Sequence, residues 1–267
     1  MVSFTDLRMA LLKLGLSHTP VIAHASLSAF GDVVGGAETL LRATLDSVWA
    51  LVMPTFTYQT MIAPADGPPR NGMLYRGDSD VDTHVEPFTP GKPADKLMGA
   101  MSEALRLHPR ARRSSHPILS FAGANAGAFL AAQSVAEPFG VIGALAEADA
   151  WILLLGTDHT VNTSLHYAER LAGRRQFVRW ALLEDRICEC PGFPGDSAGF
   201  GAIARDLDAV ARQVTVGSAL IQAMPVRAVL SAAAARLQAD PFGLLCGVTG
   251  CLRCEAVRES VRLAAAT

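Results

Sequence analysis

Short apolar runs, separated by glycine-rich and helical segments, limit the possible folds of this chain more than any other feature of its sequence. The first run ends at His24 and enters a loop rich in serine and glycine, HASLSAFGDVVGGAETL. Apolar residues at helical spacing begin at about Ala37, and a second run, ALVMPTF, contains Pro54 near its end. Strand, helix and strand in this order predict a βαβ unit with parallel strands and a right-handed crossover.

The rest of the chain repeats this alternation. Helical spacing is found in the first 14 residues, over 93–108, from residue 125, and in VIGALAEADA (141–150). Strand patterns are found at ILSFAG (118–123) and WILLLGTD (151–158) and at RRQFVRWALLED (174–185), where we expect antiparallel pairing. The tail from about residue 200 reads as mostly helical, with one strand at QVTVG (213–217). These patterns predict an α/β fold whose mixed, largely parallel sheet is flanked by helices.

Residues 57–95 interrupt the pattern with a long segment that is dense in proline, glycine and aspartate. Long loops in compact domains are usually either functional lids or disordered. We therefore predict a long irregular loop over about residues 57–95, which is either a functional lid or disordered. Neither an internal repeat nor a clear linker divides the sequence, so we predict one domain over residues 1–267, with a cysteine-containing tail at about 242–267.

Composition excludes several classes of protein. Half of the residues are hydrophobic and 18% are charged, which is enough for a sizeable core. A net charge of -2 argues against a nucleic-acid binder, and a polycationic substrate would need a local acidic patch. We find neither a secretory signal nor an apolar stretch of about 18 residues, so we expect a cytoplasmic protein without a membrane partner. The oligomeric state is not indicated.

The five cysteines are Cys188, Cys190, Cys246, Cys251 and Cys254. An odd number without a signal peptide is poor support for a disulfide framework. The close spacing of the last three allows a tetrahedral thiolate zinc site if a fourth cysteine meets them in space. Our hypothesis is a structural zinc bound by Cys190, Cys246, Cys251 and Cys254, with Cys188 as a substitute for Cys190. The alternative is a set of small buried thiols near a chain end.

A polar cluster, NTSLHYAE (162–169), follows the strand pattern at residues 151–158. Thr163, His166 and Glu169 are each three residues apart, so they share one face of a helix. A histidine beside a carboxylate is suited to general-base chemistry. The alternative is an ordinary helix start, for which Asn162 or Thr163 is a good N-cap residue.

The loop between the first strand and its helix has two interpretations. Gly35 and Gly36 precede a helix start, where exposed N–H groups favour an anion such as pyrophosphate. The loop matches neither of the generic nucleotide-binding patterns, and a plain strand-to-helix turn explains it equally well.

Four blocks of sequence, in order, resemble the aminoglycoside 3-N-acetyltransferase family. They are HASL with GDVVGGA (24–37), VMPT (52–55), RSSHPILSF (113–121), and LLG with NTSLHYAE (154–169). The resemblance extends over about residues 1–235. It implies an α/β architecture distinct from the GNAT fold, in which the long irregular segment at about 57–95 is a substrate-cleft loop. It also implies an enzyme that uses acetyl-coenzyme A to acylate the 3-amino group of a 2-deoxystreptamine aminoglycoside.

The resemblance also implies roles for particular residues. It places coenzyme A against Ser26, Leu27, Ser28, Gly31, Val34, Gly35, Gly36, Arg112, Arg113, Ser115, His116 and Ser120. The alternative for Arg112 and Arg113 is a solvated basic turn.

For the reaction, we expect His166 to act as the general base, Glu169 to orient it or bind substrate, and Thr163 to donate to the oxyanion. We expect the amine to be bound by Tyr58, Asp82, Glu86 and Asn162.

Other functions fit the sequence less well. An acyl-coenzyme A-dependent enzyme that acts on a different amine is the main alternative, and a non-catalytic zinc-binding protein is a further one. A serine hydrolase is disfavoured, because we expect no nucleophile elbow of the G-x-S-x-G type. A histidine metalloenzyme is disfavoured because the histidines lack H-E-x-x-H spacing.

Overall fold

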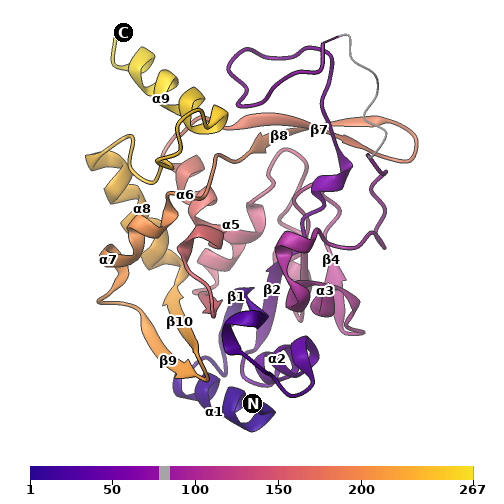
Figure 1. Cartoon of the computed structure of the whole chain (residues 1–267), viewed down its shortest axis with the longest axis vertical. Coiled ribbons are helices and arrows are strands. Elements are labelled where there is room, and N and C mark those ends of the chain that lie inside the picture. The colour runs from indigo at the N-terminus through magenta and orange to yellow at the C-terminus, as the bar shows by residue number, and fades with distance from the viewer. Residues whose placement is uncertain (78–84, 267) are drawn as a thin grey trace.

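A seven-stranded mixed sheet forms the centre of the computed structural model, which describes residues 1–77 and 85–266 (Figure 1). Its strand order is β4 (Ala111–Arg113), β5 (Phe121–Ala124), β2 (Ala50–Pro54), β1 (Pro20–Ala25), β6 (Trp151–Leu155), β10 (Ala219–Pro225) and β9 (Arg212–Val216). The three central strands β2, β1 and β6 are parallel, and the four outer pairings are antiparallel. The predicted mixed α/β sheet is confirmed, but "largely parallel" describes only its centre.

Apart from His24 in β1, the parallel strands are apolar, because both faces of the sheet are covered. Side chains alternate across a strand, so Val21 and Ala23 join one core while Ile22 joins the other. The first core includes residues of the helices α1 (Phe4–Lys13), α2 (Gly36–Leu45) and α3 (Ala100–Leu107). The second includes residues of α4 (Gly127–Leu130), α5 (Gly140–Glu147), α6 (Ser164–Leu171), α7 (Ala204–Leu207) and α8 (Val226–Ala239).

Local sequence explains where the first helix begins and which face it buries. Ser3 and Asp6 form a capping box, in which each side chain accepts a hydrogen bond from the backbone N–H of the other. Leu7 and Leu11, one turn apart, are buried, as is Leu14 just after the helix. Each such leucine contributes roughly 2 kcal/mol to stability.

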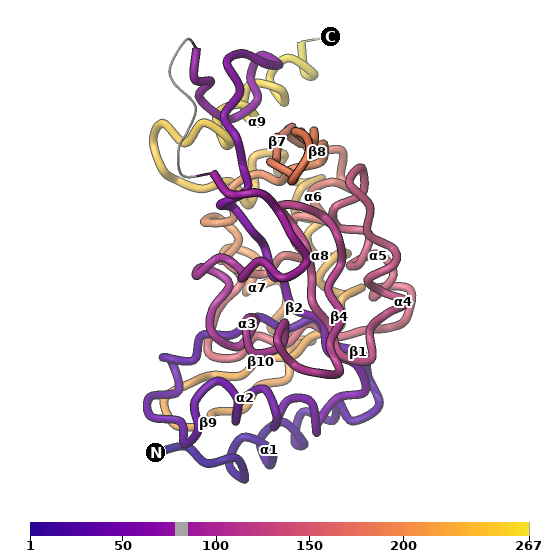
Figure 2. The backbone as a smooth tube through the Cα atoms, turned by 90° about the vertical axis from the view of Figure 1, so that its right-hand side faces the viewer, coloured from indigo at the N-terminus to yellow at the C-terminus, as the bar shows by residue number. Residues whose placement is uncertain are grey.

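A smaller antiparallel sheet lies beyond one end of the main sheet (Figure 1). It contains β3 (Met61–Ile62), β7 (Phe177–Leu182) and β8 (Ile187–Phe193). The C-terminal helix α9 (Leu252–Ala264) lies at the same end, whereas α1 and the N-terminus lie at the opposite end (Figure 2). The predicted antiparallel pairing of residues 174–185 is confirmed by the β7–β8 ladder.

Two helix predictions required correction. The expected helix over 93–108 is divided into the 3-10 turn Lys96–Met98 and α3, because Gly99 has a φ of 81° that ends the first helical segment. The tail was expected to have a single strand, yet β10 pairs antiparallel with both β6 and β9. The pairing with β6 joins segments that are far apart in the chain, so the spacing of apolar residues along the chain cannot predict it.

The long segment of residues 57–95 is mostly irregular where it is described, as predicted, apart from a 3-10 turn (Tyr58–Thr60) and β3. Among the described residues, no helix is both long enough and apolar enough to cross a membrane.

Candidate active site

A cavity of about 950 Å³ opens at the carboxyl ends of the three parallel strands. The ends of β1 and β6 are side by side, because Ala25 pairs with Leu155 and the N–H of Ser26 donates to the carbonyl of Leu155. The loops that follow these strands, with residues Ser26 and Thr157, therefore meet at one edge and line the cavity. This edge is the usual ligand position in α/β sheets.

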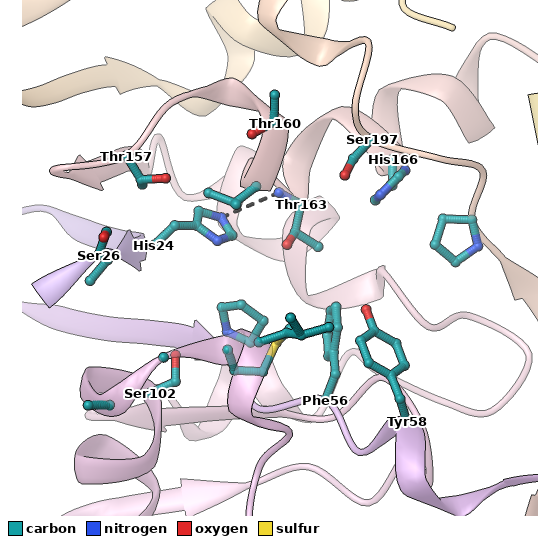
Figure 3. Close-up of a pocket in the computed structure, with 18 of the residues that line it drawn as sticks. His24, Ser26, Phe56, Tyr58, Ser102, Thr157, Thr160, Thr163, His166 and Ser197 are labelled. Carbon is teal, nitrogen blue, oxygen red and sulfur yellow. Dashed lines mark hydrogen bonds between the residues drawn. The ribbon is translucent and has the colours of Figure 1, made fainter. Parts of the chain in front are cut away.

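The two ends of the cavity differ in composition (Figure 3). One end carries small polar groups, from His24, Ser26, Ser102 and Thr157. The other end contains Tyr58, His166 and Ser197. Thr163, from the start of α6, lies between the two groups.

The predicted histidine–carboxylate pair is formed. Nδ1 of His166 lies 3.0 Å from Oε2 of Glu169, one turn along α6, and His166 lines the cavity. The other carboxylate oxygen of Glu169 accepts a hydrogen bond from Arg174 at 2.7 Å. Arg174 is fixed in turn by the carbonyls of Pro241 and Gly243. Because Glu169 is only 1% exposed, this arrangement holds a carboxylate rigidly behind the imidazole.

Aromatic rings fix the plane of the His166 imidazole. The ring of Phe139 is stacked on it with centroids 5.9 Å apart, and the tilted ring of Phe200 lies at 4.7 Å. Nδ1 is occupied by Glu169 and the ring lines the cavity, so Nε2 is the nitrogen free to exchange a proton with a bound molecule.

A second histidine, His24, supports the start of α6 (Figure 3). Its Nε2 accepts a hydrogen bond from the backbone N–H of Thr163 at 3.4 Å. Burial, with smaller effects from His159 and His166, lowers the pKa of His24 to about 3, so the ring is neutral. Thr163 is the N-cap of α6 but makes no side-chain cap hydrogen bond. Its hydroxyl is therefore not used by the helix and lies at the cavity.

Of the residues expected to bind coenzyme A, the structure brings Ser26, Leu27 and Ser28 to the cavity. The rest of that loop, Gly31, Val34, Gly35 and Gly36, lies outside its lining. The loop instead pairs with the N-terminus, where the N–H of Val34 donates to the carbonyl of Val2.

The block at residues 113–121 mainly holds the fold together. The guanidinium of Arg113 donates to Oγ of Ser120 and to the carbonyls of Thr55, Pro90 and Lys92. Burial lowers the pKa of Arg113 to about 10.

The neighbouring histidine has a similar structural role. Nδ1 of His116 accepts from the N–H groups of Ile118 and Leu119, and burial lowers the pKa of His116 to about 4. Arg113, His116 and Ser120 are all outside the lining of the large cavity.

The remaining expected cofactor residues lie away from this cavity. Ser115 is not part of its lining. Arg112 lines a separate, smaller hollow of about 660 Å³ with Trp49 and Asn125.

The structure places the residues expected to bind the amine in different surroundings. Tyr58 lines the cavity, and burial raises its pKa to about 12. Glu86 is exposed and pairs with Lys92 at 2.5 Å, and it is not part of the lining. Asn162 is buried, where it bonds to Nδ1 of His159 and caps the N–H of Ser164. Asp82 lies outside the described residues.

Sequence reasoning missed two cavity arginines, because each is an isolated cation within an apolar or helical pattern. Arg179 donates to the carbonyls of Asn71, Gly72 and Val178, and its charge lies over the ring of Phe193. Burial lowers the pKa of Arg179 to about 10.

The second arginine, Arg253 in α9, lies 3.0 Å from Asp196 and donates to the carbonyl of Gly195. Among the described residues, the lining of this cavity contains no aspartate or glutamate.

Ser197 was also missed, and the expectation that the chain has no G-x-S-x-G pattern was wrong. Residues 195–199 read GDSAG, and Ser197 lies in the cavity wall near His166 (Figure 3). The segment is not an elbow, however. It is an irregular loop, and Ser197 does not have the positive φ found at strained turns.

The expected zinc ligands are only partly brought together. Thiols of Cys246, Cys251 and Cys254 cluster, but the fourth group is Asp196 and not Cys190. The inclusion of Cys190 was wrong because β8 pairs with β7 and buries that thiol in the core, 3.6 Å from the carbonyl of Cys188.

Known proteins are similar to this chain in sequence and in fold. A family model for aminoglycoside 3-N-acetyltransferases matches residues 22–238. Aminoglycoside N(3)-acetyltransferase VII of Streptomyces paromomycinus is 32% identical over 249 residues, covering 82% of this chain and 85% of that enzyme.

Solved structures show the same fold. The apoenzyme of aminoglycoside acetyltransferase AAC(3)-IVa superposes with a TM-score of 0.78 and 24% identity, covering 97% of this chain and 98% of that one. A variant of that enzyme is known in complex with apramycin. AAC-IIIb, solved as a binary complex with CoASH, has a TM-score of 0.72 and 22% identity, covering 91% and 98%.

Proposed function

The chain belongs to the aminoglycoside 3-N-acetyltransferase family, which makes it an acyltransferase, and from this premise we propose its reaction. It transfers an acetyl group from acetyl-coenzyme A to the 3-amino group of a 2-deoxystreptamine aminoglycoside. The relative in Streptomyces paromomycinus is named for that position, and the related AAC-IIIb binds CoASH. The cavity is large enough to hold the reacting parts of both molecules.

The observation that carries this proposal is the His166–Glu169 pair at the cavity wall. An ammonium has no lone pair, so it first loses one proton to solvent and becomes a neutral amine. In our proposal, Nε2 of His166 takes the second proton from the amine nitrogen as that nitrogen bonds to the acetyl carbon, and Glu169 fixes the tautomer and stabilises the imidazolium. The C–S bond then breaks, and the leaving thiolate takes this second proton from His166, which leaves a neutral amide and a thiol.

Thr163 is our candidate for stabilising the tetrahedral intermediate. Its hydroxyl lies at the cavity between His24 and His166 and is not used to cap α6 (Figure 3). A preorganised donor of this kind is worth roughly 3 kcal/mol in the transition state. The neutral ring of His24 fixes the position of Thr163 through its backbone N–H. We therefore assign Thr163 to the oxyanion and His24 to positioning.

The coenzyme is proposed to enter at the end of the cavity that contains Ser26, Leu27 and Ser28. The small side chains of Ser26 and Ser28 leave space there for a pantetheine arm, and their backbone follows a strand end. The amine would then occupy the opposite end, beside Tyr58, His166 and Ser197, with Thr163 between donor and acceptor (Figure 3).

A second candidate function has a specific observation in its favour. Aminoglycosides carry several positive charges, whereas the described lining contains Arg179 and Arg253 and no carboxylate. Arg253 is paired with Asp196, but the described partners of Arg179 are neutral carbonyls. This charge pattern favours an amine that bears an acidic group, acylated by the same machinery.

Thiol release from acetyl-coenzyme A tests both candidates. We expect turnover that requires an amine and that falls on the order of 10²-fold or more in His166→Ala, the scale of a lost general base. The exposed His18 supplies a control, and His18→Ala should retain full activity. An aminoglycoside panel and a set of carboxylate-bearing amines separate the two substrates. Absence of coenzyme A binding would overturn the proposed reaction itself.

A further inference from the structure

Four metal-ligating groups gather where the N-terminus of α9 meets the loop after β8. The sulfur atoms of Cys246, Cys251 and Cys254 and one carboxylate oxygen of Asp196 all lie within 4.8 Å of one another. The sulfurs of Cys246 and Cys254 are 3.3 Å apart. Around a zinc ion with Zn–S bonds of about 2.3 Å, tetrahedral ligand atoms are separated by roughly 3.8 Å. The cluster therefore has the dimensions of a tetrahedral site.

The chain brings these groups together from two distant segments. Cys251 is the N-cap of α9 and Cys254 lies in its first turn, so both sulfurs are at the same helix end. Cys246 comes from the irregular segment before the helix, and Asp196 comes from a loop far earlier in the chain. Cys246 and Cys254 are buried, at 2% and 0% exposure. Such convergence from separate segments is typical of structural zinc sites.

Two arginines offset the charge that such a site would carry. Three thiolates and a carboxylate around a divalent ion leave a net charge of about -2. Arg253 lies 3.0 Å from Asp196, and Arg258 donates at 2.7 Å to the carbonyl of Cys246. Both guanidiniums belong to α9, the helix that carries two of the cysteines at its start. These two guanidiniums lie next to the cluster and would offset part of that charge if the ion is bound.

A disulfide would explain the position of only two of these four groups, whereas a zinc site explains all four. The disulfide would link two of the thiols, for example Cys246 and Cys254, and would leave Cys251 and Asp196 without a role. The five cysteines are all free thiols in this structure. Soft thiolate ligands with one oxygen select zinc over magnesium or calcium, which prefer sites made of oxygen alone.

We propose that Cys246, Cys251, Cys254 and Asp196 bind a structural zinc ion that fastens α9 to the loop carrying the cavity wall. With four protein ligands the site is closed, so the ion has no open position for substrate. Gly195, Ser197 and Arg253, which neighbour the ligands in sequence, all line the cavity. The ion thus holds one wall of the cavity in place. This inference does not depend on which amine is acylated.

Metal content of the full chain, purified under reducing conditions from zinc-supplemented medium, tests the site. We expect about one zinc per chain in the wild type and at least a roughly tenfold weaker affinity in Cys251→Ser. Cys188→Ser is the matched control, since both thiols are partly exposed and Cys188 lies outside the cluster. It should retain full zinc.

A cobalt experiment keeps the proposal testable if a variant fails to fold. Cobalt(II) added to chelator-treated wild type should give the intense thiolate-to-cobalt absorption of a tetrahedral site. Asp196→Asn should change its visible bands while the three sulfurs remain. Wild type with well under one zinc per chain and no cobalt absorption would overturn the site. So would a Cys246–Cys254 disulfide found by mass spectrometry of the purified protein. An unchanged cobalt spectrum in Asp196→Asn would remove Asp196 as the fourth ligand.

Discussion

At the residue scale, the side chain of Glu169 does two things at once. One oxygen faces the imidazole of His166 and the other accepts a hydrogen bond from Arg174, and all three side chains are largely buried. Hydrogen bonds to a carboxylate from charged donors are among the stronger ones in proteins, so the contact with Arg174 fixes the position of this side chain. The same residue therefore contributes to the proposed chemistry and to the attachment of the loop at Pro241 and Gly243, through Arg174.

Replacing Glu169 with glutamine should affect both properties. We expect kcat to fall on the order of 10²-fold, because the imidazolium loses its anionic partner. Urea unfolding should show a loss of about 3 kcal/mol, because Arg174 is left buried and unpaired.

A neighbouring ion pair supplies the control for this substitution. Glu137 pairs with Arg170, also on α6, but both side chains are partly exposed. Glu137→Gln should change stability by less than about 1 kcal/mol and leave kcat unchanged. Equal effects of the two substitutions on kcat would contradict the orienting role of Glu169.

At the element scale, the end of β6 determines how closely the loop after β1 can approach. Gly156 has a φ of 66°, and a Cβ there would lie 2.7 Å from Cβ of Ala29 and 3.2 Å from the carbonyl oxygen of Ser26. Only glycine combines this backbone conformation with so close a contact. The loop with Ser26 is consequently held against the strand end, where it forms one end of the cavity.

Gly156→Ala should lower the free energy of unfolding by about 1–3 kcal/mol and weaken coenzyme A binding, because strain and contact both displace the loop. At two other glycines an added Cβ would meet no atom within 4 Å, so they separate the cost of the backbone conformation from the cost of the close contact. Gly173→Ala, with a φ of 73°, should show the backbone cost alone, and Gly127→Ala should be near neutral or slightly stabilising. Urea unfolding and calorimetric titration measure the two effects. A neutral Gly156→Ala would contradict the packing argument.

At the scale of the whole molecule, buried neutral histidines make stability depend on pH. Burial lowers the pKa of His24 to about 3 and of His116 to about 4, and it also lowers the pKa of His159. An unfolded histidine titrates near 6.5, so below that pH the unfolded chain binds protons that the folded chain does not. The free energy of unfolding therefore falls as the pH falls from about 6.5.

His24 and His116 should each lower stability by about 2 kcal/mol between pH 7 and pH 5. His24→Gln keeps an acceptor for the N–H of Thr163 but removes one titrating ring. Its stability loss between the two pH values should be smaller than that of wild type by about 2 kcal/mol. His18→Gln, at an exposed site, is the comparison for a histidine on the surface. Identical losses in wild type and His24→Gln would sink this account.

The sequence by itself determined those features that depend on neighbours along the chain. Apolar runs and helical spacing predicted β1, α2, β2 and β6. A strand covered on both faces gives a continuous apolar run, and an amphipathic helix gives apolar residues three or four positions apart. The His166–Glu169 contact was predicted for the same reason, since residues three apart in a helix must share a face.

Only the tertiary structure decided which distant segments meet. β10 forms a strand because its backbone pairs with those of β6 and β9, although its residues were expected to belong to a mostly helical tail. Arg113 stabilises the fold and does not line the cavity, because its guanidinium donates hydrogen bonds to carbonyls from other segments. Asp196, and not Cys190, reaches the cysteine cluster because β8 turns the thiol inward. Such outcomes depend on burial and long-range pairing, which local periodicity does not encode.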